Sequence, residues 1–147
     1  MDKIIFALPS GALGVITPAL AAIRSDESMG DFLARLSAKR VPAEAVGVEI
    51  VDETALPDRF FRNAWRLAGA VVVEDPDECR TLRAAQYAAA KLQTLRGLRD
   101  REDLGENVTA ERAVVRAVDP AAEAAGKTPD QLRAHWPGAI ERREGGR

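Results

Sequence analysis

In the first half of the chain, apolar residues form short runs. Residues that are typical of turns lie between these runs. Runs at positions 4–8 and 13–17 flank Pro9-Ser10-Gly11, and this arrangement predicts a β-hairpin. Two further apolar runs, at 46–51 and 70–74, predict two more strands. We therefore expect a small, mostly antiparallel sheet in this half of the chain.

The run at 46–51 has a period of two. Residues two apart in a strand point to the same side of the sheet. Valine and isoleucine occupy every second position there, so one apolar row is expected to face a core. That row contains Val46, Val48 and Ile50.

One short amphipathic helix is expected before this strand. Ser28, with Asp31 three residues later, is typical of a helix N-cap, and the helix is predicted to end before Val41-Pro42. Lysine and arginine at 39 and 40 would complement the negative end of the helix dipole. The apolar face of this helix is expected to contain Phe32, Leu33 and Leu36.

The second half of the chain has a helical pattern that is rich in alanine. Asp75-Pro76-Asp77-Glu78 combines an N-cap, a proline at the first helical position and a glutamate at the third, which predicts the start of a long helix. Apolar residues spaced by three or four then form a narrow stripe, with arginine and glutamine beside it expected to stay in water. The stripe contains Leu82, Ala85, Ala89, Leu92 and Leu95.

These patterns predict an α+β fold with two lobes. The N-terminal lobe at 1–75 is expected to hold the sheet and its helix, and the C-terminal lobe at 76–147 an alanine-rich helical hairpin. A short last helix is expected to begin at a Thr128 capping box and to be anchored by Trp136. Residues 141–147 are expected to form a frayed tail.

Composition and charge narrow the possible classes of protein. The 147 residues are 46% hydrophobic and 30% charged, which favours a folded chain with a real core over disorder. A net charge of -2 provides no strong positive field for nucleic acid or an anionic membrane. The lone Cys79 and the short N-terminal apolar run favour synthesis inside the cell without an export or membrane-spanning segment.

Few residues of the chain have a pattern that is typical of a catalytic, cofactor or metal site. Gly126-Lys127-Thr128 has the last residues of a phosphate-binding loop, but Ala121 occupies the position where that loop needs its first glycine. His135 is the only histidine, so a zinc site lacks ligands, and no serine lies in a Gly-x-Ser-x-Gly elbow. Cys79 is expected to pack as a small apolar residue. We therefore expect no catalytic residue, no cofactor and no metal.

The segment at 58–65 concentrates large and charged side chains. Phe61 is expected to be a core residue. Trp65 has two possible roles, because it can fill the core four residues after Phe61, or it can join Arg62 as a binding residue at an interface.

This segment, together with a second block, resembles a family of small proteins of tailed bacteriophages that are encoded among tail and tail-fibre genes. A valine-rich strand ending in aspartate, followed by Asp-Arg-Thr-Phe-Arg-Asn-Ala-Trp, recurs in that family, and Phe60 here replaces the threonine. The residues that carry the resemblance lie at 41–43, 48–52, 56–59, 61–65, 119–125 and 128–137.

The resemblance implies a tail or tail-fibre binding protein, an adaptor or assembly chaperone without catalysis. It would act in the host cytoplasm during assembly or stay in the virion tail, and its partner would be a tail-fibre protein or further copies of itself. The alternatives are a capsid-decorating virion protein and a small phage-encoded, host-directed enzyme or inhibitor. The residues expected to bind the partner are Arg62, Trp65, Leu82, Ala85, Ala89 and Leu92.

Overall fold

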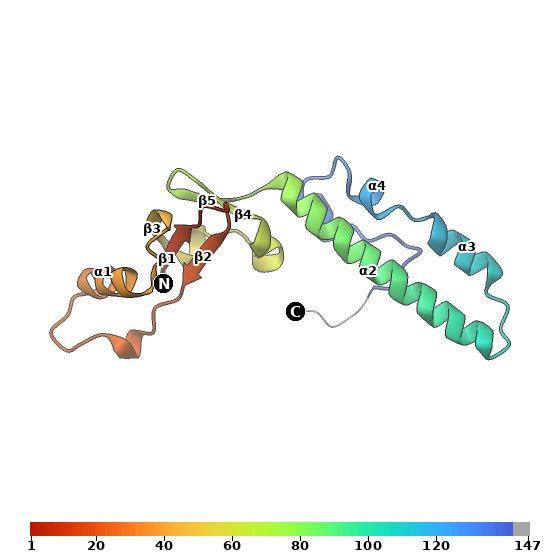
Figure 1. Ribbon diagram of the computed structural model, residues 1–147, viewed down its shortest axis with the longest axis horizontal. Helices are drawn as coiled ribbons and strands as arrows, with labels where there is room; N and C mark the ends of the chain where they lie inside the picture. The colour runs from red at the N-terminus through yellow and green to blue at the C-terminus, as the bar shows by residue number, and fades with distance from the viewer. Residues whose placement is uncertain (143–147) are drawn as a thin grey trace. The chain divides into compact units, whose positions relative to one another are not determined.

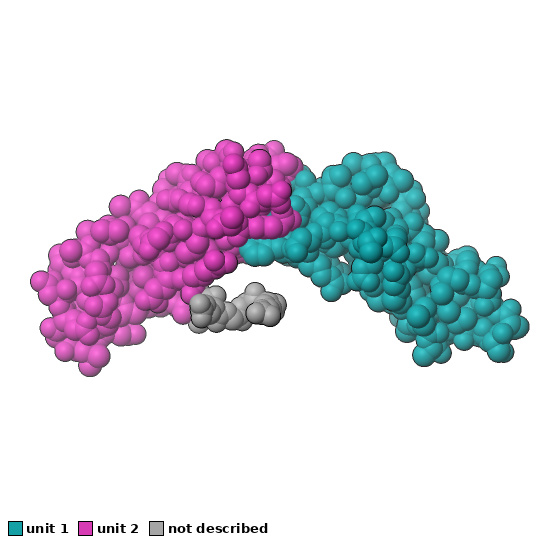
Figure 2. All heavy atoms as spheres, turned by 180° about the vertical axis from the view of Figure 1, so that it is seen from behind, with its two compact units in different colours: residues 1–75 teal, residues 76–147 magenta. Residues whose placement is uncertain are grey.

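The computed structural model describes residues 1–142, and the chain divides into two compact units, Met1–Asp75 and Pro76–Arg147 (Figure 2). Among residues 1–142, all strands lie in the first unit, and the described part of the second unit is helical. The predicted α+β fold, with small antiparallel sheets followed by a long helix, is confirmed. Most of the tail predicted at 141–147 lies outside the described residues.

A three-stranded antiparallel sheet forms the centre of unit 1 (Figure 1). Its strands are β1 (Asp2–Ala7), β2 (Leu13–Ile16) and β3 (Val46–Asp52), in the order β2-β1-β3. The predicted hairpin between β1 and β2 is confirmed. It is held closely together because the ring of Phe6 lies over Gly14, where an added Cβ would come within 2.0 Å of the phenylalanine Cζ.

A second hairpin covers one face of this sheet. Strands β4 (Trp65–Ala68) and β5 (Val71–Glu74) pair across a two-residue turn in which Gly69 has a φ of +65°, a conformation that favours glycine. The core between the two sheets is centred on Ile5, Trp65 and Val72. Half-buried residues packed against it are Leu13, Val15, Val51, Leu56 and Leu67.

The prediction for the apolar row of β3 is wrong. Val46 and Ile50 are 62% and 53% exposed, and Val48 is exposed as well. Residues opposite each other in an antiparallel ladder point to the same face, and Ile5 lies opposite Glu49, so the covered face of β3 is the one that carries Val51. The second hairpin packs on that face and leaves the valine and isoleucine row outside.

Helix α1 (Met29–Arg40) has the predicted bounds. The side chain of Ser28 accepts a hydrogen bond from the backbone N–H of Asp31, and Phe32 and Leu33 are buried. Three short 3-10 turns complete unit 1: η1 (Leu20–Ala22), η2 (Glu53–Ala55) and η3 (Arg59–Ala64).

An ion pair ties the loop before α1 to the helix. The Nε and Nη2 atoms of Arg35 donate to the two carboxylate oxygens of Glu27 over 2.6 and 2.7 Å. This hydrogen-bonded pair lowers the pKa of Glu27 from 4.5 to about 2.

Acid will therefore weaken this attachment. Because the pKa is lower in the folded chain, the stabilisation is fully present above pH 4.5 and is lost as the pH falls from there through about 2. An NMR titration of the Glu27 carboxyl is expected to have a midpoint near 2, and Arg35→Gln is expected to move it back toward 4.5. The control Arg40→Gln, at the far end of α1, should leave it unchanged. A wild-type midpoint near 4.5 would contradict the ion pair.

Unit 2 is built on one long helix. Helix α2 (Pro76–Asp103) is followed by α3 (Thr109–Ala117), α4 (Pro120–Ala124) and α5 (Pro129–Ala134), each of which packs against α2 (Figure 1). The capping box predicted at Thr128 is present, with Gln131 as its partner. No helix within residues 1–142 is long and apolar enough to cross a membrane.

Candidate binding sites

The structure places Trp65 in the core of unit 1. Its side chain is 2% exposed and packs with Ile5 and Val72. Trp65 begins β4, and the face of β4 that carries it turns toward the three-stranded sheet. Of its two possible roles the structure has the core role, and the little surface that this tryptophan keeps belongs to the lining of a cavity in unit 1. Phe61 is buried as predicted.

Arg62 lies at the rim of a cavity of about 300 Å³ in unit 1. Its neighbour on η3, Arg59, lines the same cavity, and both arginines are exposed. In the part of the chain that the structure describes, neither guanidinium has a hydrogen-bond or ion-pair partner. The lining residues are Lys3, Val15, Glu53, Leu56, Pro57, Asp58, Arg59, Arg62 and Trp65.

A buried lysine forms another part of this cavity. The side chain of Lys3 is only 5% exposed, and its Nζ lies 3.3 Å from Oε2 of Glu53. Asp58, also in the lining, accepts a hydrogen bond of 2.7 Å from the backbone N–H of Phe60 and so caps η3. The cavity therefore holds two arginines at its rim and a lysine whose charge is already paired.

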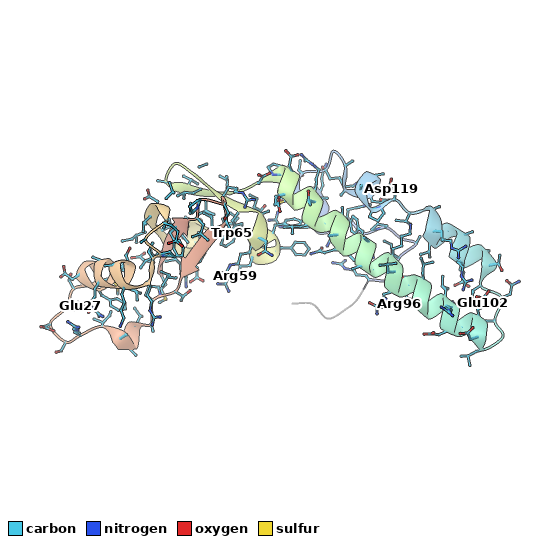
Figure 3. The ribbon with its side chains drawn as sticks, viewed as in Figure 1. Glu27, Arg59, Trp65, Arg96, Glu102 and Asp119 are labelled. Carbon is cyan, nitrogen blue, oxygen red and sulfur yellow. The ribbon has the colours of Figure 1, made fainter. Side chains whose placement is uncertain are left out.

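Trp65 is one of the residues that line the cavity (Figure 3 labels Trp65 and Arg59). The indole Nε1–H is buried, and no acceptor for it exists among residues 1–142. A buried donor without an acceptor costs about 1 to 3 kcal/mol. Sequence reasoning identified Arg62 but missed Lys3, Glu53 and Arg59, which only the fold brings together.

The middle of the stripe predicted on α2 lies on the outer side of the helix, whereas Leu95 at its end is half-buried against the cluster of Leu98, Val108 and Val115. Leu92 is 59% exposed, Ala85 and Ala89 are exposed, and Leu82 is half-buried. The side of α2 that packs within unit 2 contains other residues, namely Cys79, Arg83, Tyr87, Thr94 and Leu98. The expectation that arginine beside the stripe stays in water is therefore wrong for Arg83.

Arg83 is the centre of a buried cluster that the sequence pattern did not reveal. Its guanidinium lies 5.1 Å from the ring centroid of Tyr87 and 5.0 Å from that of Trp136. It donates to the carbonyl oxygen of His135 over 2.8 Å, and the Tyr87 hydroxyl donates to the same oxygen over 3.0 Å. These contacts fasten the segment after α5 to α2, as the predicted anchoring role of Trp136 requires. The spacing of four between Arg83 and Tyr87 was the available signal.

The residues around the phosphate-loop fragment act structurally. Lys127 Nζ donates to the backbone oxygen of Glu123, and His135 Nε2 lies 2.8 Å from the carboxylate Oε2 of the same glutamate. Gly126, with a φ of +69°, lies in the turn between α4 and α5. Within residues 1–142, no group of three histidine, cysteine or acidic side chains is placed to hold a metal ion.

Among residues 1–142, the arginine-lined cavity of unit 1 and the outer stripe of α2 contain the residues that the sequence predicted for binding. Comparison of the chain with protein-family models, with curated proteins and with solved structures finds no match.

Proposed function

We propose that this chain is a non-catalytic binding protein of a tailed bacteriophage, which acts as an adaptor or chaperone in tail-fibre attachment or assembly. The observation that carries the proposal is the exposed apolar part of the stripe on α2, in which Leu92, at 59% exposure, follows the exposed Ala85 and Ala89. The source of the partner is supported by the resemblance to phage tail proteins.

The stripe has the properties of a surface for helix docking. Ala85 and Ala89 are small, so they let another helix or strand approach α2 closely, while Leu92 supplies the bulk of the apolar area. Alanine buries little area, and a stripe of this kind therefore contributes most when it packs on a large partner. A trimeric tail fibre or a second copy of the chain provides such a surface.

A co-purification experiment tests this proposal. We expect the wild-type chain to retain the tail-fibre product encoded beside it when the two are co-expressed. The double variant Ala89→Asp, Leu92→Asp should reduce the amount retained at least about tenfold, because it places two charges in the apolar contact. Its melting temperature should change little, since both positions are exposed in unit 2.

The matched control is Ala113→Asp, the same substitution at an exposed position of α3. It should leave fibre retention at the wild-type level. Size-exclusion chromatography of the wild-type chain alone tests whether a second copy of the chain binds the α2 stripe, because such binding would give a dimer. A wild-type chain that stays monomeric and retains no tail product would overturn the proposal, as would full retention by the double variant.

A further inference from the structure

We infer that the cavity of unit 1 binds a carboxylate that is joined to an apolar group, as in the C-terminal residue of a peptide or a free acylated amino acid. This site is separate from the stripe on α2 and does not depend on it. The inference rests on three features of the cavity: its charges, its apolar wall and its size.

The charged residues that line the cavity favour a ligand with a single negative charge. Arg59 and Arg62 both line the cavity, and neither has a partner among the described residues. A guanidinium presents two parallel N–H donors whose spacing matches the two oxygens of a carboxylate. The pair of arginines is therefore equipped to hold such a group at the rim.

The other charged residues of the lining disfavour the binding of an anion with more than one negative charge. Glu53 and Asp58 are also in the lining, and Lys3 is already paired with Glu53 at 3.3 Å. The lining thus carries three cationic and two anionic side chains, a formal net charge of +1. A monoanion balances that charge, whereas a phosphate dianion would be repelled by the two carboxylates.

The wall favours an apolar group beside the carboxylate. Val15, Leu56, Pro57 and the indole of Trp65 form the apolar part of the lining. A volume of about 300 Å³ lies at the lower end of the range for small-molecule sites. It suits one branched aliphatic side chain with its carboxylate rather than a nucleotide.

The indole of Trp65 supplies a built-in reporter. Its Nε1–H is buried without an acceptor among residues 1–142, and Trp65 is one of the residues that line the cavity. Because the Nε1 atom is buried, we expect the ligand to contact the ring of Trp65 without a hydrogen bond to Nε1. A ligand that packs on the ring changes its surroundings and will shift the indole N–H signal in a 15N-correlated NMR spectrum.

The test is a titration of the full chain with N-acetylleucine, followed at the Trp65 indole signal, which Trp136→Phe distinguishes from the other indole. We expect a saturable shift with N-acetylleucine and none with N-acetylleucinamide, which has the same apolar body without the charge. The double variant Arg59→Gln, Arg62→Gln should raise the Kd at least about tenfold. The control Arg40→Gln, on α1, should leave the Kd unchanged.

A second probe distinguishes the two sources of the carboxylate. The tripeptide Ala-Ala-Leu with a free C-terminus should bind as well as N-acetylleucine if the site takes peptide C-termini, and less well if it takes free acylated amino acids. The inference is overturned if N-acetylleucine gives no saturable shift, if the amide binds equally, if inorganic phosphate binds more tightly, or if the double variant retains the wild-type Kd. None of these results bears on fibre retention through α2.

Discussion

Replacing Trp65 with alanine will lower the free energy of unfolding of unit 1 by about 3 to 5 kcal/mol. The side chain is 2% exposed and lies in the core between the two sheets, against Ile5 and Val72. Its removal takes away the largest fully buried side chain of the unit and leaves a cavity that the short strands around it can close only in part. Urea denaturation followed by circular dichroism measures the loss.

The control for this variant is Val71→Ala. Val71 is the neighbour of the buried Val72 on β5 but points outward, at 57% exposure, so its replacement should cost less than about 1 kcal/mol. If Trp65→Ala melts like the wild type while the chain loses a partner, the core position of this tryptophan is contradicted and the interface role returns.

Replacing Tyr87 with alanine will destabilise unit 2 by a similar amount, about 3 to 5 kcal/mol. Tyr87 is fully buried on α2, and its ring meets that of Trp136 edge to face at 5.3 Å and lies beside the Arg83 guanidinium. The substitution removes the side chain that joins α2 to the segment after α5. Urea denaturation followed by the helical circular dichroism signal provides the measurement, because unit 2 is helical among the described residues.

The matched variant Tyr87→Phe keeps the ring and removes only the hydroxyl. We expect it to cost about 1 to 3 kcal/mol. The His135 carbonyl oxygen keeps its hydrogen bond from Arg83, but the Nε–H of Arg83 loses the hydroxyl that accepts from it over 3.2 Å. A Tyr87→Phe variant that is as unstable as Tyr87→Ala would show that the hydroxyl dominates over ring packing. A Tyr87→Ala variant with wild-type stability would contradict the buried cluster itself.

Local signals in the sequence were sufficient for the positions of the main elements. Ser28 caps α1, Pro76 begins α2, and the capping box at Thr128 begins α5, as predicted. These features depend on hydrogen bonds within about one helical turn, so neighbouring residues determine them without help from the rest of the fold. The β1–β2 hairpin likewise follows from its own strands and turn.

The side of each element that is buried was decided by tertiary structure. Both rows of β3 contain apolar residues, and the β4–β5 hairpin selects the one with Val51. On α2 the returning helices cover the side with Arg83 and Tyr87 rather than the regular stripe. A periodic pattern specifies that a face exists, but burial depends on which distant segment packs there.

For the candidate sites, too, the sequence was sufficient for some residues, and others were brought together only by the fold. Arg62 and the α2 stripe could be named from residue type and spacing, because a binding arginine and an apolar repeat are local features. The cavity could not, since Lys3, Glu53 and Arg59 come from β1, η2 and η3 and meet only after the sheet has paired. The sequence by itself therefore determined where the helices and strands begin and end, while the fold determined which side chains face one another, because their proximity depends on pairing between residues far apart in the chain.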